Sequence, residues 1–148
     1  MDLITVADLA DASWQNSIPF VPPVINGKVI KVYDGDTITI ATRLPFPNSP
    51  IYRFPVRLLG IDTAEIKGKT FEEKASAVAA RDALSVKIFG KMVVLKNVST
   101  EKYGRILADV YLGNLHLNKW MLDQKLAVEY DGGTKHRPAE WQTILITE

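Results

Sequence analysis

The chain has 148 residues, enough for one domain with a buried core and too few for two domains of typical size. Its 18 Lys and Arg residues nearly balance its 17 Asp and Glu residues, so a net charge of +1 gives no general attraction to polyanions, and nucleic-acid binding would depend on local placement of charge. The sequence has no Cys, which excludes disulfides, thiolate metal sites and a Cys nucleophile.

The first 26 residues are expected to form an extension in front of a domain that spans residues 27–148. Thr5 and the apolar residues of the segment 3–14, at helical spacing, predict a short helix that packs as an arm on the domain. The N-terminus carries acids where a signal peptide needs Lys or Arg, and no run is long and apolar enough to span a membrane. We therefore expect an intracellular protein with no membrane partner, and a monomer.

Five segments have the apolar or alternating pattern of strands, and they span residues 27–32, 37–41, 51–61, 91–98 and 105–112. The sequence YDGD interrupts the first hairpin, and RLPFPNSP at residues 43–50 predicts a long, proline-stiffened hairpin loop. Gly113-Asn114 predicts a tight turn, and residues 127–130 a short extended segment.

Helical signals follow the third strand and the fifth. Thr70 and Glu73 make a capping box that opens a helix ending near Gly90. The apolar residues of this helix follow the i, i+3, i+4 pattern at positions 71, 75, 78, 79, 83 and 86. Asn118 predicts the cap of a second helix over residues 119–126.

A further helix of two or three turns is expected over residues 139–145, with Trp141 as its core anchor. Five short strands with the main helix between the third and the fourth is the element order of an OB-fold barrel. The predicted fold class is therefore α+β and mainly β, a five-stranded OB-fold barrel with about three helices.

Four acids lie at predicted strand ends and turns, where their side chains could converge at the barrel mouth: Asp34, Asp36, Asp62 and Glu65. Because no His or Cys accompanies them, an all-oxygen site would select a hard cation, Ca²⁺ or Mg²⁺, over zinc. Ordinary turn chemistry is the alternative for each acid taken alone, since Asp-Gly is a common turn dipeptide.

Two arginines stand at the apolar strands beside these acids. Arg57 lies within VRLLGIDTAE, and Arg105 follows Tyr103-Gly104. A guanidinium is always charged and presents a planar fork of donors that suits a phosphodiester, although either residue alone could be a surface or ion-paired arginine. Simple alternation places Arg57 and Asp62 on opposite faces of a strand, so a shared site requires the strand to bend or end near Asp62.

Three motifs in order, KVYDGDTITI, VRLLGIDTAE and EKYGRILADVYL, resemble the staphylococcal nuclease (thermonuclease) family from about Gly27 to Tyr130. The resemblance implies a five-stranded OB-fold barrel with three helices. It also implies Ca²⁺-dependent hydrolysis of DNA and RNA phosphodiester bonds, with 3′-phosphate ends.

Position by position, Asp36 and Asp62 resemble the family's carboxylate Ca²⁺ ligands, with the backbone carbonyl of Thr63 beside them, and Asp34 a supporting acid. Glu65 resembles the residue that positions or deprotonates the attacking water. The remaining residues resemble the arginines that hold the scissile phosphate and the tyrosines that contact the nucleotide: Arg57, Arg105, Tyr103 and Tyr130.

The chain departs from the family pattern in three places. Ala64 stands where the family commonly has Pro, the segment 66–69 before the helix is short, and the loop 43–50 is long. The segment and the loop are expected near the substrate groove, so they bear on specificity.

Two other functions compete with a nuclease. A catalytically inactive module of this family, binding nucleic acid or protein, should have lost at least one key acid or arginine, and none is missing here. An OB-fold module that only binds single strands should carry more aromatic residues and a more basic surface.

Overall fold

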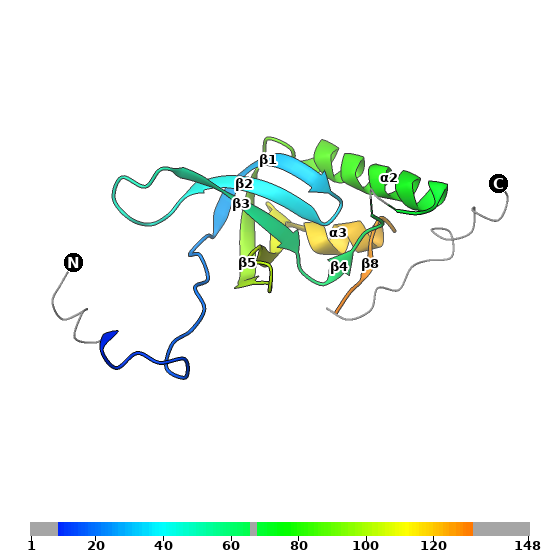
Figure 1. Ribbon diagram of the computed structural model, residues 1–148. Coiled ribbons are helices and arrows are strands. Elements are labelled where there is room, and N and C mark those ends of the chain that lie inside the picture. Colours follow the sequence, from blue (N-terminus) through cyan, green and yellow to red (C-terminus); the bar gives the residue numbers. More distant parts are fainter. Residues whose placement is uncertain (1–8, 66–67, 132–148) are drawn as a thin grey trace.

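Five strands curl into a closed barrel in the computed structural model, which describes residues 9–65 and 68–131 (Figure 1). The strands are β1 (Asn26–Asp34), β2 (Thr37–Arg43), β3 (Ile51–Leu58), β5 (Met92–Thr100) and β6 (Ile106–Leu112). Antiparallel pairing gives the order β3-β2-β1-β5-β6, and parallel pairing of β3 with β6 closes the circle. The prediction of a mainly β, α+β OB-fold barrel is confirmed, with the predicted strand order along the chain.

Three short strands extend this framework: β4 (Ile61–Asp62), β7 (Leu115–His116) and β8 (Val128–Glu129). β7 pairs with β6 across the predicted Gly113-Asn114 turn, where Gly113 has a φ of +58°. β4 pairs with β8, so the segment that carries Asp62 lies beside the segment that leads to Tyr130. The predicted tight turn and the short extended piece at residues 127–130 are therefore confirmed.

The core fills the barrel through the alternation of its strands. Ile38 and Ile40 of β2, Val56 and Leu58 of β3, and Ala108 of β6 are fully buried. Each large aliphatic side chain of this kind contributes about 1.5–3 kcal/mol on burial. Helix α2 (Phe71–Ile88) packs against β1, and helix α3 (Leu117–Asp123) packs against β6.

Helix α2 begins and ends where the sequence predicts. The Thr70 hydroxyl accepts a hydrogen bond from the Glu73 amide at 2.9 Å, which satisfies one of the free N–H groups of the first turn. After the C-cap at Phe89, Gly90 adopts a φ of +79°, a conformation that L side chains rarely adopt.

The predicted buried face of α2 is wrong. Of the residues in that pattern, Phe71 is 70% and Val86 is 85% exposed. The buried side chains lie on another face of α2: Glu73, Ala77, Ala80, Leu84 and Ile88. Because the helix is rich in Ala, its apolar residues surround most of its circumference, and contact with β1 selects the buried face.

Asn118 does not cap α3, contrary to the sequence-based prediction. The helix starts at Leu117 with His116 as the N-cap, and Asn118 is only 3% exposed. Its Oδ1 accepts from the Val110 amide at 2.9 Å, and its Nδ2 donates to the carbonyls of Leu59 at 2.8 Å and Ala108 at 3.2 Å. The buried amide thus joins α3, β6 and the turn after β3, where main-chain groups need partners in the absence of water.

Replacing Asn118 by Ala should lower the free energy of unfolding by about 2–3 kcal/mol, because the buried Val110 amide and the Leu59 carbonyl lose the partner that Asn118 provides, while the Ala108 carbonyl keeps its hydrogen bond from the Leu59 amide. Urea denaturation followed by circular dichroism measures this change. The neighbouring Lys119→Ala is the matched control, since that side chain is 68% exposed and should change stability by less than about 0.5 kcal/mol. Equal stability of the two variants would contradict a structural role for the Asn118 amide.

The residue 139–145 helix predicted with Trp141 lies outside the described residues, as does most of the predicted helix over residues 3–14. In the part of the chain that the structure describes, no helix combines the length and the apolar character needed to cross a membrane.

The N-terminal extension packs on the barrel at Val24, which is 3% exposed, but the large apolar side chains of the described residues before it are exposed. Trp14 and Ile18 are each 89% exposed, and Phe20 is 71% exposed. Figure 1 shows this segment leading away from the strands. The predicted packing arm over residues 3–14 lies mostly outside the described residues, and its described end at Trp14 does not pack on the barrel.

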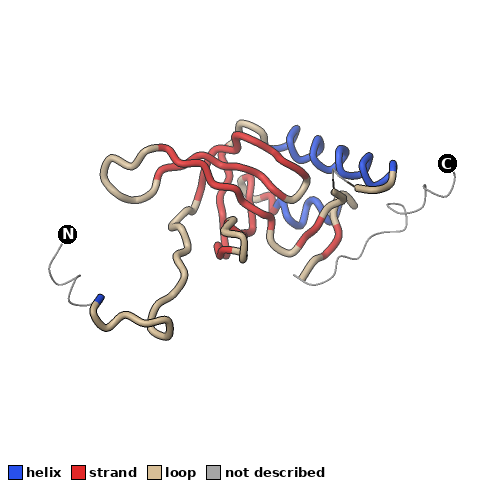
Figure 2. The backbone as a smooth tube through the Cα atoms, in the orientation of Figure 1, coloured by secondary structure: helices blue, strands red, loops and turns tan. Residues whose placement is uncertain are grey.

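The long hairpin loop between β2 and β3 is confirmed, but its predicted place near the substrate groove is wrong. Its base is braced by Ser49, whose hydroxyl accepts from the Leu44 amide at 3.0 Å, and by Arg43, which donates to the Ser49 carbonyl at 2.6 Å. The loop projects beyond the ends of both strands (Figure 2). It lies at the end of β2 opposite Asp36, roughly 20 Å along the strand.

Candidate active site

The tight turn between β1 and β2 places two acids at one end of the barrel. Asp34 Oδ1 accepts from the Asp36 amide at 3.1 Å, which closes the turn, and Asp36 is only 5% exposed. A Cβ on Gly35 would lie 2.7 Å from Ala80 of α2 and 2.8 Å from the Thr63 side chain. Gly35 therefore lets the turn pack closely against α2 and the segment after β4.

A second turn brings Arg57 and Asp62 onto the same side. β3 ends at Leu58, Gly60 takes a φ of +80°, and β4 restarts at Ile61. This break cancels the strand alternation, and Arg57 Nη2 lies 3.3 Å from Asp62 Oδ1. The condition for a shared site, an end of the strand near Asp62, is thus met.

Main-chain carbonyls hold the Arg57 guanidinium in place. Its Nη1 donates to Leu58 O at 3.1 Å and to Ile61 O at 2.9 Å, and its Nη2 also lies 3.6 Å from Asp36 Oδ2. The side chain is 12% exposed. Several fixed acceptors around one planar group leave its orientation little freedom.

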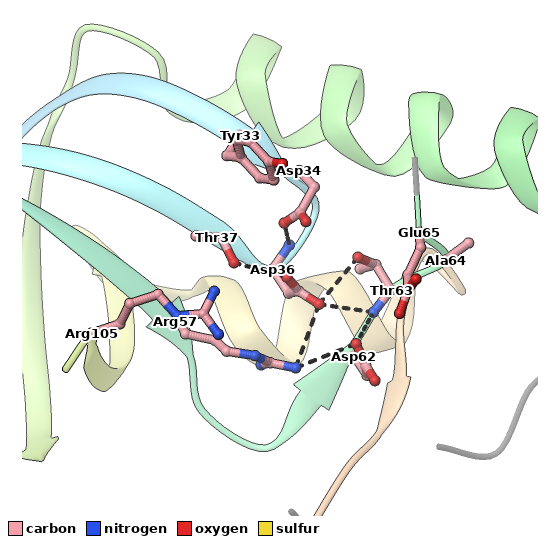
Figure 3. A pocket seen from close by; sticks show the side chains of 10 residues that line it. All are labelled: Tyr33, Asp34, Asp36, Thr37, Arg57, Asp62, Thr63, Ala64, Glu65 and Arg105. Carbon is pink, nitrogen blue, oxygen red and sulfur yellow. Dashed lines mark hydrogen bonds and ion pairs between the residues drawn. The ribbon is translucent and has the colours of Figure 1, made fainter. Parts of the chain in front are cut away.

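The carboxylates of Asp36 and Asp62 converge on Thr63 (Figure 3). The Thr63 amide donates to Asp36 Oδ2 at 3.1 Å and to Asp62 Oδ1 at 3.0 Å, and the Thr63 hydroxyl donates to Asp36 Oδ2 at 3.2 Å. Thr37 donates to the other Asp36 oxygen at 3.0 Å. Residues 27 positions apart in the chain therefore meet at one point.

The pKa values of the two acids in this turn shift in opposite directions. Burial, with the hydrogen bond to Asp36 and the charge of Asp36, raises the pKa of Asp34 to about 7. Burial also acts to raise the pKa of Asp36, but the hydrogen bond from Asp34, the charge of Arg57 and the hydrogen bonds from Asp62 and Thr63 outweigh it and lower that pKa. Negative charge is therefore concentrated on Asp36.

Glu65 and Arg105 complete one cavity of about 340 Å³ with the residues above. Glu65 is exposed, just after the buried Thr63 and Ala64. Arg105 immediately precedes β6, which pairs with the strand of Arg57, and it follows Gly104, which has a φ of +87°. The ten residues that line the cavity are Tyr33, Asp34, Asp36, Thr37, Arg57, Asp62, Thr63, Ala64, Glu65 and Arg105.

An acid positions Arg105 within its own turn. The Glu101 carboxylate binds the guanidinium through two contacts, with Nε and, at 3.0 Å, with Nη2. The Glu101 amide donates to the Arg105 carbonyl at 2.9 Å, which closes the same turn. A two-point contact fixes the plane of the guanidinium beside the cavity.

The two tyrosines named in the sequence analysis are not among the residues that line the cavity. Tyr103 is 75% exposed, with Lys102 Nζ 5.0 Å from its ring centroid. Tyr130 supports the site indirectly, because the Arg57 Cζ lies 5.4 Å from its ring centroid. The structure thus brings seven of the nine candidate residues together, Asp34 included.

Three residues of the site were missed by sequence reasoning: Tyr33, Thr37 and Glu101. Thr37 and Tyr33 flank the two acids of the turn, so their place in the sequence was a usable signal. Glu101 precedes Arg105 by four residues, the spacing of an ion pair within a tight turn.

The donors at the cavity are oxygen atoms. In residues 9–65 and 68–131, no group of three or more His, Cys, Asp or Glu side chains is arranged so that it could hold a metal ion. A cation here would therefore depend on the two carboxylates that converge on Thr63, with main-chain, water or ligand oxygens as the other donors.

Comparison with known proteins identifies a family that matches much of this chain. The family described as staphylococcal nuclease homologue matches residues 55–145, more than half of the chain. The match begins after the turn that carries Asp34 and Asp36. The hydrogen bond from the Thr63 amide to Asp36 connects that turn to the matched residues.

Two curated relatives are similar over shorter stretches. An uncharacterised protein of Bacillus anthracis is 32% identical over 100 residues, which cover 66% of this chain and 44% of that protein. Protein ParB of Escherichia coli is 33% identical over 88 residues, which cover 60% of this chain and 42% of that protein. The chain thus spans less than half the length of these relatives. With the family match over residues 55–145, the chain belongs to the staphylococcal nuclease homologue family.

Proposed function

We propose that the chain is a calcium-dependent nuclease that hydrolyses phosphodiester bonds of DNA or RNA and leaves 3′-phosphate ends. The observation that carries this proposal is the convergence of Asp36, Asp62 and Arg57 from two turns far apart in the sequence. Glu65 and Arg105 line the same cavity. Membership of the staphylococcal nuclease homologue family supports the same activity.

The oxygen donors fit a hard divalent cation. The carboxylates of Asp36 and Asp62, with the main-chain carbonyl of Thr63, would hold Ca²⁺, which takes oxygen ligands. When bound, the ion would neutralise phosphate charge and orient the phosphate oxygens. Because Asp36 is buried and its pKa is lowered, its carboxylate is charged and ready to bind a cation at neutral pH.

The two arginines are the proposed phosphate clamps. Arg57 is held by the carbonyls of Leu58 and Ile61, and Arg105 by the carboxylate of Glu101. Preorganised cations of this kind stabilise the additional negative charge that develops at phosphorus during attack by water. Their fixed orientation means that little reorganisation is needed when a phosphate enters.

Glu65 is the proposed water-handling residue. In this role its carboxylate accepts a proton from water as the water oxygen bonds to phosphorus, and the bond from phosphorus to the 5′ oxygen breaks. The products are a 3′-phosphate and a 5′-hydroxyl, which takes up a proton. The exposure of Glu65 at the cavity gives solvent water access to it.

Degradation of single-stranded DNA, double-stranded DNA and RNA by the purified protein tests this function. We expect cleavage with Ca²⁺, loss of cleavage when EDTA removes the metal, and 3′-phosphate ends on the products. Glu65→Gln should retain the fold and lose most of the cleavage. All proposed catalytic residues come from one chain, so activity should be proportional to protein concentration, as for a monomer.

Failure of the folded protein to cleave any of these substrates with Ca²⁺, Mg²⁺ or Mn²⁺ would contradict the nuclease proposal. Binding of nucleic acid without cleavage would then favour the inactive module of the same family.

A further inference from the structure

Tyr33 owes its place at the cavity to an irregularity in β1. Val32 pairs with Ile38 of β2 and Asp34 pairs with Thr37, so Tyr33 is an extra residue in the ladder. Such bulges redirect a side chain and are over-represented next to active sites. Figure 3 shows the Tyr33 ring beside Asp34, where it lines the cavity.

The Tyr33 ring is not used to build the core. It is 57% exposed, and in the described residues the structure gives its hydroxyl no hydrogen bond and its ring no aromatic neighbour. The ring makes a cation–π contact with Lys31, whose Nζ lies 5.7 Å from the ring centroid. Lys31 is also exposed, so an aromatic face and a cation stand together in solvent at the edge of the cavity.

We propose that Tyr33 and Lys31 form a subsite that binds an unpaired nucleotide next to the cleaved phosphate, with the base stacked on the Tyr33 ring and a phosphate on Lys31. This inference rests on the proposed nuclease function. Exposed aromatic rings beside cations bind single strands by base stacking, and the aromatic face of a base in a duplex is already covered by its neighbours. Because Arg57 and Arg105 are assigned to the cleaved phosphate, a neighbouring phosphate needs another cation, and Lys31 lies beside the Tyr33 ring.

Binding of two fluorescent strands separates the stacking contact from the phosphate contact. The strands are octathymidylate and a backbone of equal length that has abasic sites in place of the bases, and fluorescence anisotropy in EDTA measures their affinity without cleavage. Tyr33→Ala should weaken octathymidylate binding about tenfold and leave the abasic strand unchanged, because only the first strand offers bases. Tyr33→Phe keeps the ring and should stay within about twofold of the original protein.

Lys31→Met should weaken the binding of both strands equally, because both strands carry phosphates. Tyr52→Ala is the matched control: Tyr52 is 39% exposed on β3, outside the cavity, and its loss should change neither affinity. Three results would overturn the subsite. Tyr33→Ala could weaken binding of the two strands equally, it could weaken binding of neither strand, or Tyr52→Ala could weaken binding by a comparable factor. A protein partner at Tyr33, instead of a base, would give no loss on either strand.

The same variants distinguish this inference from the nuclease proposal. With Ca²⁺, Tyr33→Ala should raise KM for octathymidylate about tenfold and leave kcat within about twofold, since stacking binds substrate and transition state alike. Strand-selective loss of binding in a protein that never cleaves would sustain the subsite and reject the nuclease. Cleavage by the original protein, with no effect of Tyr33→Ala on either affinity or KM, would support the nuclease proposal and reject the subsite.

Discussion

Replacing Arg57 by Lys should lower kcat/KM for single-stranded DNA by about a hundredfold or more, although the positive charge is kept. Arg57 uses its planar fork to contact the carbonyls of Leu58 and Ile61 while it faces Asp36 and Asp62. A lysine ammonium is a point charge on a flexible stem and cannot satisfy this geometry. The loss should fall mainly on kcat, because the contact strengthens as charge develops on the phosphate.

The measurement compares steady-state kinetics of Arg57→Lys and Arg53→Lys, because Arg53 is an exposed arginine on the same strand. Arg53→Lys should remain within about twofold of the original activity. Lys is preferred to Ala at position 57, since Ala would leave two nearly buried carboxylates without their cation and could cost about 3–5 kcal/mol of stability. Nearly full activity of a folded Arg57→Lys would remove Arg57 from the proposed catalytic residues.

Replacing Asp36 by Asn should weaken Ca²⁺ binding by about tenfold or more and lower cleavage by about a hundredfold at fixed Ca²⁺. Asn keeps the shape and one carbonyl oxygen, so it can still accept from Thr63, but it removes the charge that Arg57 and the surrounding hydrogen bonds maintain. Calorimetric titration with Ca²⁺ alone reads the binding effect without dependence on activity.

Asp82→Asn provides the control, because Asp82 is an acid on α2 with a side chain 59% exposed and lies outside the cavity. Partial rescue of Asp36→Asn cleavage at high Ca²⁺ is also expected, since weaker binding can be overcome by concentration. Unchanged Ca²⁺ affinity in Asp36→Asn, with the fold intact by circular dichroism, would show that Asp36 does not hold the ion.

Much of the barrel and most of the candidate site could be predicted from the sequence, because these features depend on local chemistry. Alternating apolar residues mark β2, and Thr70 and Gly90 mark the ends of α2. The YDGD turn and the GIDTAE segment carry their acids in the chain order of a known family, so the acids of the cavity could be named before their distances were known.

The remaining features depend on contacts between distant segments, which a local pattern does not contain. The buried face of α2 is selected by β1, and Asn118 is used by main-chain groups of Leu59, Ala108 and Val110 instead of by its own helix. A bulge that alternation cannot reveal turns Tyr33 toward the cavity.

The order of strands and turns and the kinds of side chain at the site can be read from the amino-acid sequence, since they follow from periodicity, turn chemistry and residue type. The meeting of Arg57, Asp36 and Asp62 depends on the folded chain, because the break at Gly60 overrides strand alternation and the close approach at Gly35 brings the two turns together. Convergence of this kind depends on packing between segments that are distant in the chain, which no single stretch of residues encodes.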